Sequence, residues 1–219
     1  RQGGQVTLLE PNERLGKKLN ITGKGRCNVT NDCDQETLMA NIPGNGRFLY
    51  SALTRFTPQD AMAFFEGLGV PLKVERGNRV FPVSDRSFDI SGALERELRR
   101  LHVRWVRDRA REITVQDGHV TGVQGEKQHY PASAVVLATG GVSYPATGST
   151  GDGYRLARQA GHTLVEPVPS LVSLVSHDPD CKKMMGLALK NVTLTLFEDG
   201  KDIFEEQGEM LFTHFGISG

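Results

Sequence analysis

Residues Val6–Asn31 read VTLLEPNERLGKKLNITGKGRCNVTN, and this stretch decides the fold class. It begins within Gln5–Glu10, a short apolar run that ends in an acid and predicts a buried parallel strand. It ends in Gly23–Asn31, GKGRCNVTN, which packs two glycines, two cations, a thiol and three hydrogen-bonding side chains into nine residues. That mixture suits a metal, a reactive cysteine, a bound phosphate or a well-capped turn.

Composition narrows these choices. The 219 residues carry 26 Lys and Arg against 26 Asp and Glu, so net charge favours neither nucleic acid nor anionic membrane. No apolar run approaches the ~18 residues that cross a bilayer, and no signal peptide opens the chain. Cys27, Cys33 and Cys181 form no CxxC pair, which argues against a disulfide framework and a zinc site. We therefore predict a cytoplasmic protein with no membrane association and no metal.

Local patterns predict an α/β domain followed by antiparallel strands. Residues 11–47 are expected to be rich in loops. The expected helices are Thr57–Gly69 with Thr57 as N-cap, a helix capped by Asp85 or Ser87 that reaches Leu101, and Gly151–Gly161. The expected strands are Arg79–Pro82, residues 103–107, a hairpin turning at Asp117-Gly118, the buried run Ala134–Ala138, and a second hairpin turning at Glu198–Gly200. This order predicts a nucleotide-binding domain with an all-β insertion that begins near residues 170–190.

The acid-ended strand is half of a dinucleotide fingerprint. The other half is a glycine-rich turn about 20 residues earlier, after a first strand. Only four residues precede the strand, and Leu211–Gly219 stops inside a strand that leads to a glycine turn. We therefore expect the chain to lack parts of a longer protein at both ends; a complete protein with a short first strand is the alternative.

Four stretches carry a resemblance to a known family. They are Val6–Asn31, Arg79–Ser87 (RVFPVSDRS), Val135–His162 (VVLATGGVSYPATGSTGDGYRLARQAGH) and Gly208–Gly219 (GEMLFTHFGISG). In this order they resemble the bacterial FAD-binding flavoproteins described as NAD(P)/FAD-dependent oxidoreductases or aminoacetone oxidase family enzymes. These are distant relatives of the glutathione-reductase and fumarate-reductase flavoproteins. The combination is specific, whereas TGDG or ATGG alone is weak.

The resemblance implies a Rossmann-like FAD-binding domain, here without its first strand and GxGxxG turn, into which an antiparallel β-rich domain is inserted. Residues 1–170 would form the middle of the FAD-binding domain. Residues 171–208 would begin the inserted domain, and residues 209–219 would return to the FAD-binding domain. The missing turn leads us to expect weak or absent FAD binding by the 219-residue chain alone.

The resemblance also assigns cofactor-binding roles in the first half of the chain. Glu10 would accept the ribose hydroxyls of FAD, since two carboxylate oxygens suit a diol. The loop Gly23–Asn31 would supply donors to the pyrophosphate and ribityl chain, with Lys18 adding positive potential. Its contributing residues would be Gly23, Gly25, Arg26, Cys27, Asn28 and Thr30. The alternatives are a surface acid at a strand end, asparagines that cap turns, and an arginine paired with a carboxylate; we interpret Cys27 as a packed side chain rather than a redox centre.

A second set of cofactor-binding residues follows the expected strand Ala134–Ala138. Small residues suit a backbone that touches the pyrophosphate, and a helix start favours an anion or a polarised carbonyl. The resemblance implicates Ala138, Thr139, Gly140, Gly141, Gly151, Asp152 and Gly153, with Arg111 near the adenine. A plain turn after a strand, and an acid that only caps the helix dipole, are the alternatives.

The implied function is flavin-mediated redox chemistry on a small-molecule substrate, with NAD(P)H as a candidate electron donor. Reduction of a C=C bond and oxidation of an amine or alcohol both fit, and no catalytic acid or base is identified. A flavin-binding protein that modifies RNA and a non-catalytic flavin-binding protein are the alternatives. The arginines between Arg96 and Arg109 alternate with acids, so we expect a solvated helix face and no nucleic-acid partner.

Overall fold

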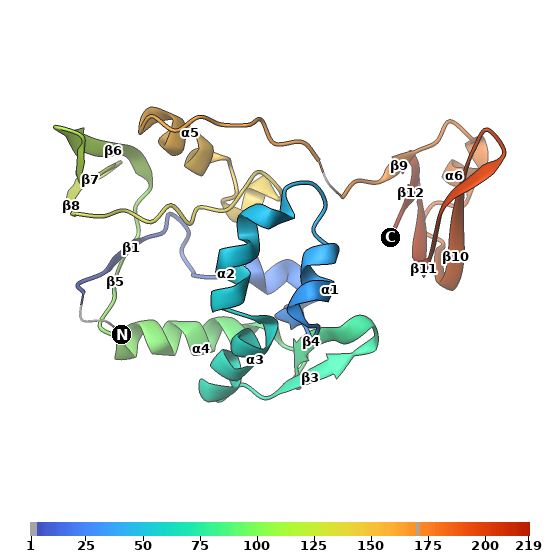
Figure 1. Ribbon diagram of the computed structural model, residues 1–219, viewed down its shortest axis with the longest axis horizontal. Helices are drawn as coiled ribbons and strands as arrows, with labels where there is room; N and C mark the ends of the chain where they lie inside the picture. Colours follow the sequence, from blue (N-terminus) through green and yellow to red (C-terminus); the bar gives the residue numbers. More distant parts are fainter. Residues whose placement is uncertain (1–3, 170) are drawn as a thin grey trace. The chain divides into compact units, whose positions relative to one another are not determined.

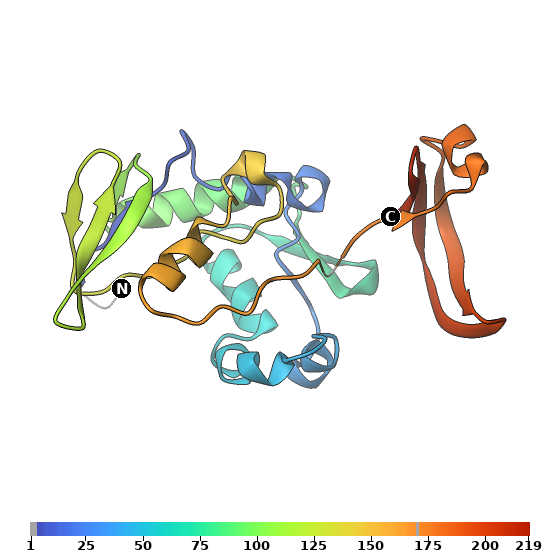
Figure 2. The same ribbon diagram turned by 90° about the horizontal axis from the view of Figure 1, so that it is seen from above.

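The computed structural model describes residues 4–169 and 171–219 (Figure 1). The chain divides into two compact units, Arg1–Leu164 and Val165–Gly219. The first is a mixture of helices and small sheets and the second is mainly antiparallel strands (Figure 2). The predicted α/β class is confirmed, although most strand pairing in the described residues is antiparallel rather than parallel.

The acid-ended run of the opening stretch forms strand β1 (Thr7–Leu9), which pairs in parallel with β5 (Arg104–Val106). Glu10 continues the pairing, because its amide donates to the Val106 carbonyl at 3.1 Å. The predicted parallel strand is therefore confirmed, but it is exposed to half-buried because β5 is its one strand neighbour in the described structure.

A three-stranded antiparallel sheet contributes buried side chains to the first unit, among them Val80 and Phe81. The strand order is β2 (Thr30–Asn31), β4 (Arg79–Pro82), β3 (Leu72–Glu75). The short 3-10 segment η3 (Arg76–Asn78) connects β3 to β4. Helix α4 (Ser87–Arg100) packs on the 3-10 segment η1 (Leu19–Gly25). The buried core cluster consists of Cys27, Val70, Ile90 and Ala93.

The N-cap predicted from the sequence is present at one helix and absent at another. Helix α3 (Pro58–Gly67) has the predicted N-cap: the Asp60 amide donates to Thr57 Oγ1 at 3.1 Å, and the Thr57 amide donates to the Asp60 carboxylate at 2.9 Å. At α4 the prediction was wrong, because the N-cap is Arg86 and makes no side-chain cap bond. The Ser87 hydroxyl instead donates to the Asn20 carbonyl at 3.0 Å, and Asp85 pairs with Lys73 at 2.7 Å.

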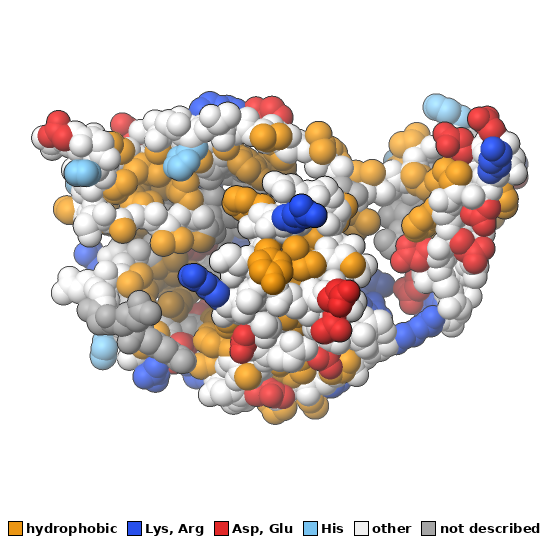
Figure 3. All heavy atoms as spheres, viewed as in Figure 1, with side chains coloured by type: hydrophobic (Ala, Val, Ile, Leu, Met, Phe, Trp, Pro, Cys, Tyr) orange, Lys and Arg blue, Asp and Glu red, His pale blue; other side chains and the backbone are white. Residues whose placement is uncertain are grey.

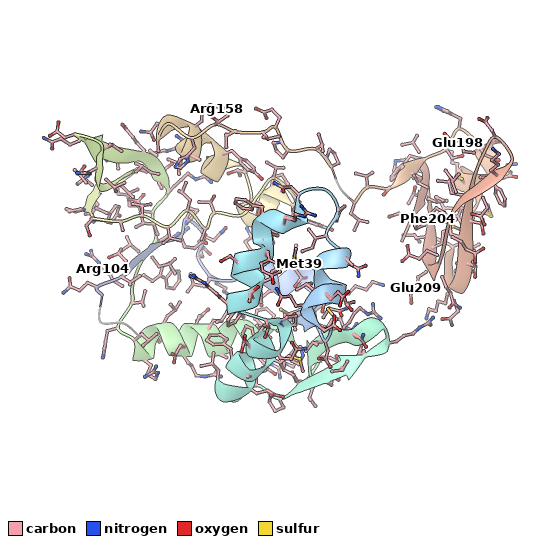
Figure 4. The ribbon with its side chains drawn as sticks, viewed as in Figure 1. Met39, Arg104, Arg158, Glu198, Phe204 and Glu209 are labelled. Carbon is pink, nitrogen blue, oxygen red and sulfur yellow. The ribbon has the colours of Figure 1, made fainter. Side chains whose placement is uncertain are left out.

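Helices lie both within residues 11–47, which were expected to be rich in loops, and directly after them. Asp34 caps α1 (Gln35–Ala40), and η2 (Gly46–Leu49) leads into α2 (Tyr50–Arg55). Met39 of α1, labelled in Figure 4, lies over the position of Gly46. Large apolar side chains of η2, of α2 and of the residue after α2 are exposed: Phe48, Leu49, Tyr50 and Phe56. Figure 3 shows hydrophobic side chains, in orange, on the face that carries α2.

A β-meander completes the strands of the first unit. It comprises β6 (Ala110–Gln116), β7 (His119–Gly125) and β8 (His129–Pro131), and its turn confirms the predicted hairpin, with Asp117 and Gly118 both at positive φ. Helix α5 (Asp152–Gln159) docks on β6, since the Gln159 side chain bonds both the amide and the carbonyl of Ile113 at 3.1 Å.

The prediction of a buried strand at Ala134–Ala138 was wrong, because this segment forms no strand in the structure. No other segment of residues 4–169 or 171–219 pairs with it, and Val136 is 88 % exposed. An apolar run becomes a buried strand only where neighbouring strands satisfy its amides and carbonyls and cover its side chains.

The second unit is a four-stranded antiparallel sheet with one short helix, α6 (Pro179–Lys183). The strand order is β10 (Ala188–Glu198), β11 (Lys201–Thr213), β12 (Gly216–Ser218), β9 (Leu174–Val175). The β10–β11 turn at Asp199-Gly200 confirms the second predicted hairpin. β11 runs across the expected boundary at 208/209 without a break, so the assignment of residues 209–219 to the FAD-binding domain stays a prediction.

Candidate functional site

Glu10 stands at the end of β1 with its carboxylate held by Asn12. The Asn12 amide N–H donates to Glu10 Oε1 at 2.8 Å, and the Asn12 side-chain amide donates to the same oxygen at 2.7 Å. The Asn12 Nδ2 also donates to the Thr147 carbonyl at 3.1 Å. The acid at the strand end is thereby joined to a loop more than a hundred residues further along the chain.

That loop is the glycine-rich segment between Ala138 and Gly153, which includes the 3-10 segment η4 (Pro145–Thr147). Lys18, just before η1, donates to both the carbonyl and the hydroxyl of Ser143, at 3.1 and 2.7 Å. The Gly151 amide donates to the Gly141 carbonyl at 3.2 Å, which closes the loop on itself. Hydrogen bonds from Asn12 and Lys18 therefore join the end of β1 and the start of η1 to the segment 138–153. Binding of a cofactor by these residues stays a prediction.

The first turn of α5 packs tightly on the ATGG turn. A Cβ at Gly153 would overlap Thr139 Oγ1, so only glycine fits this approach without a shift. Gly151 is the N-cap and gives no side-chain cap bond. The first amides of α5 are the ordinary donors of a helix N-terminus, and Ala138, Thr139 and Gly140 beside them are exposed.

Asp152 and Arg111 are both engaged by arginines. The Asp152 carboxylate lies 3.6 Å from the Arg109 guanidinium and 3.9 Å from that of Arg155. Arg155 also donates to the Arg111 carbonyl at 2.6 Å, and the Arg111 guanidinium pairs with Glu126. The structure thus supports the alternative for Asp152, an acid near a helix start with cationic partners; a contact of Arg111 with adenine stays a prediction.

The GKGRCNVTN loop has an unusual backbone. Gly23, Lys24, Gly25 and Cys27 all have positive φ, between 57° and 87°. At Gly23 a Cβ would meet Phe81 Cε1 at 2.9 Å and the Asn28 amide nitrogen at 3.0 Å, so glycine is needed there for both space and φ. Non-glycine residues in this conformation cost free energy and cluster at functional sites.

Arg26 is held by its own chain. Its Nη1 lies 3.0 Å from the Glu75 carboxylate and 3.5 Å from Asp85, and its guanidinium stacks on Phe81 at 3.9 Å from the ring centroid. The hydrogen bond from Arg26 lowers the pKa of Glu75, and the one from Lys73 lowers the pKa of Asp85. This is the alternative named above, an arginine paired with a carboxylate; direct contact of Arg26 with a cofactor stays a prediction.

The remaining loop residues have structural partners. Cys27 is 4 % exposed, and this burial raises the pKa of its thiol, which suits a packed side chain better than a nucleophile. Thr30 pairs with Val80 between β2 and β4. The Asn28 amide donates to the carbonyls of Val80 and Thr30, at 3.2 and 3.0 Å, in the orientation that satisfies both its polar atoms. Gly25 is exposed with open space around it.

The sequence did not single out several residues that hold Glu10, the glycine-rich loop and Arg26 in place. Asn12 and Ser143 tie the strand end to the glycine-rich loop, and Glu75 and Asp85 hold Arg26. None of them stands in a spacing that a local pattern detects. Asp85 lies within RVFPVSDRS, where the sequence named it only as one of two alternative helix caps and gave it no role in the site.

An acid-ended parallel strand joined to a glycine-rich helix entrance is typical of Rossmann-type domains. The comparisons agree: the family model described as HI0933-like protein Rossmann domain matches residues 1–217, and the chain belongs to this flavoprotein family.

Three curated relatives match nearly the whole chain. The 3-dehydro-bile acid delta(4,6)-reductase of Clostridium scindens is 37 % identical over 98 % of this chain and 52 % of its own length. The ribosomal RNA dihydrouridine synthases of Escherichia coli and Haemophilus influenzae are 29 % and 28 % identical, over 99 % of this chain and 53 % and 54 % of theirs. The chain therefore spans about half the length of the curated relatives it matches. In the described part of the chain, no helix is long and apolar enough to cross a membrane.

Proposed function

We propose that the whole protein is an FAD-dependent reductase that adds hydrogen across a carbon–carbon double bond conjugated to a carbonyl group. The observation that carries the proposal is the meeting of Glu10 with the glycine-rich entrance of α5, through Asn12 and Lys18. Membership of a flavoprotein family supports the nature of the cofactor.

The residues present fit FAD. Both hydrogen bonds from Asn12 fall on Glu10 Oε1, so they leave the Oε2 atom for a ribose hydroxyl. The exposed backbone of residues 138–140 and the glycine-capped start of α5 suit a pyrophosphate, which needs close approach and N–H donors. Lys18 adds a cation beside this loop. When bound, the flavin would supply hydride transfer, while these residues bind and orient it.

The names of the relatives narrow the reaction class. A delta(4,6)-reductase acting on a 3-dehydro compound and a dihydrouridine synthase both act at a C=C bond conjugated to a carbonyl. Of the reactions left open by the sequence, reduction of a C=C bond is therefore favoured over oxidation of an amine or alcohol. A 3-oxo steroid acid is the first substrate to test, since the relative with that chemistry is 37 % identical.

Anaerobic flavin spectroscopy of the whole protein tests the proposal. NADH or NADPH should bleach the flavin, and a 3-oxo-Δ4,6 steroid acid should restore its colour while gaining two hydrogens. Oxidation of an amine or alcohol that bleaches the flavin, with no response to the enone, would overturn the reaction class. A flavin that neither NAD(P)H nor any such substrate reduces would indicate a non-catalytic flavin-binding protein.

The second candidate is reduction of a uridine in RNA. Two relatives named for ribosomal RNA support it, and they argue against our prediction that nucleic acid is not a partner. The charge pattern argues the other way. Several arginines of the stretch 96–109 pair with acids, among them Arg99 with Glu95 and Arg100 with Glu97. Uridine-containing ribosomal RNA that reoxidises the reduced flavin, with salt-sensitive affinity, would favour this candidate.

A further inference from the structure

We propose that Asn12 is a positioning residue for the adenosine half of FAD: it fixes the Glu10 carboxylate and ties it to the glycine-rich loop. The inference rests on the proposed cofactor and names a residue that the sequence reasoning did not single out. Asn12 itself need not touch FAD. It acts through the orientation of Glu10 and the placement of the loop at Thr147.

The geometry around Asn12 supports this role. Its backbone and side-chain N–H groups both donate to Glu10 Oε1, at 2.8 and 2.7 Å, so they select one rotation of the carboxylate. Its Nδ2 carries a third hydrogen bond, to the Thr147 carbonyl at 3.1 Å. A Cβ on Gly148 would come within 2.9 Å of that same Nδ2, so the loop closes directly over the Asn12 amide.

The hydrogen-bond chemistry makes asparagine hard to replace at this position. One amide nitrogen carries two hydrogens, and here they serve two acceptors, a carboxylate and a carbonyl. Alanine would remove both side-chain bonds and let the carboxylate rotate. Aspartate has the same shape but offers no donor and places a second negative charge beside Glu10.

The test compares three probes on the flavin-free whole protein. FAD contains both halves of the cofactor, ADP contains the adenosine half without flavin, and FMN contains the flavin without adenosine. Asn12→Ala should weaken FAD and ADP binding roughly 5- to 10-fold, the size of one or two net hydrogen bonds, and should change FMN binding less than about twofold. Asn12→Asp should weaken FAD and ADP binding at least as much, and it provides a second variant of native shape.

Two controls separate positioning from general damage. Asn20→Ala removes the part-buried hydrogen bond that the Ser91 hydroxyl donates to the Asn20 side-chain oxygen. This change should leave all three affinities unchanged. In a Glu10→Ala background, Asn12→Ala should weaken FAD and ADP binding less than it does in the unmodified protein, because the part of its effect that acts through Glu10 is already lost.

The outcomes distinguish this inference from the proposed function. If the unmodified protein binds no FAD, the proposed cofactor is wrong. If it binds FAD but Asn12→Ala shifts FMN as much as ADP, or Asn20→Ala has an equal effect, the positioning role is wrong. Full additivity of Asn12→Ala with Glu10→Ala would also overturn it.

Discussion

Replacing Gly153 with alanine tests the close approach of α5 to the ATGG turn. Gly153 lies in the first turn of α5 at a helical position, so alanine meets no φ barrier there. The added methyl would overlap Thr139 Oγ1 and lie 3.7 Å from Thr139 Cβ. Because threonine is β-branched and short, it cannot swing away as a long side chain would.

The expected magnitude combines two opposing effects. Alanine in place of a helical glycine stabilises by about 1 kcal/mol, while overpacking costs about 1–3 kcal/mol. Gly92 in the middle of α4 is a matched control, since its Cβ would meet only the Arg96 guanidinium, at an ordinary 3.5 Å. Gly92→Ala should stabilise by about 0.5–1 kcal/mol, so Gly153→Ala should be about 1–3 kcal/mol less stable than Gly92→Ala.

Urea unfolding followed by fluorescence measures this difference. The chain has one tryptophan, and Trp105 in β5 reports on the first unit, which contains both glycines. Thr139→Ala should rescue Gly153→Ala, because it removes the overlapping hydroxyl. Equal stabilisation by Gly92→Ala and Gly153→Ala, or no rescue by Thr139→Ala, would refute the packing described for α5.

Two further predictions concern the Arg26 loop. Because the pKa values of Glu75 and Asp85 are lowered in the folded state, their contribution to stability should be present above the unfolded carboxyl pKa of about 4 and should be lost as pH falls through the folded values. Glu75→Gln should therefore reduce the loss of resistance to urea between about pH 6 and about pH 3. A variant that loses stability in acid as steeply as the unmodified protein would contradict the ion pairs. In the whole protein, Arg26→Ala should reduce the flavin retained through gel filtration, whereas Cys27→Ser should leave it nearly unchanged. Loss of flavin from Cys27→Ser but not from Arg26→Ala would indicate that the Cys27 thiol is functional.

Elements fixed by neighbouring residues were predictable from the sequence. Thr57, Pro58 and Asp60 together specify the start of α3, because cap and first turn lie within four residues. Asp117-Gly118 and Asp199-Gly200 specify their hairpins, since both residues of each pair accept positive φ. The resemblance of both stretches to one family of flavoproteins implied that Glu10 and the segment 138–153 contact the same cofactor, and that shared role stays a prediction.

Features that depend on distant partners were not predictable. Ser87 does not cap α4, because its hydroxyl donates to the carbonyl of Asn20, 67 residues away. Arg26 pairs with Glu75, 49 residues away. The apolar run Ala134–Ala138 carries the pattern of a strand, yet pairing depends on a neighbour that periodicity does not identify. In each case the outcome depended on residues far away in the sequence, which a local pattern does not identify.

The flavin content of the whole protein tests the central claim most directly. Protein purified from cells should be yellow and should release about one FAD per chain on denaturation, and Glu10→Ala should lower that content while leaving the fold intact. A colourless whole protein that takes up no added FAD would contradict the account.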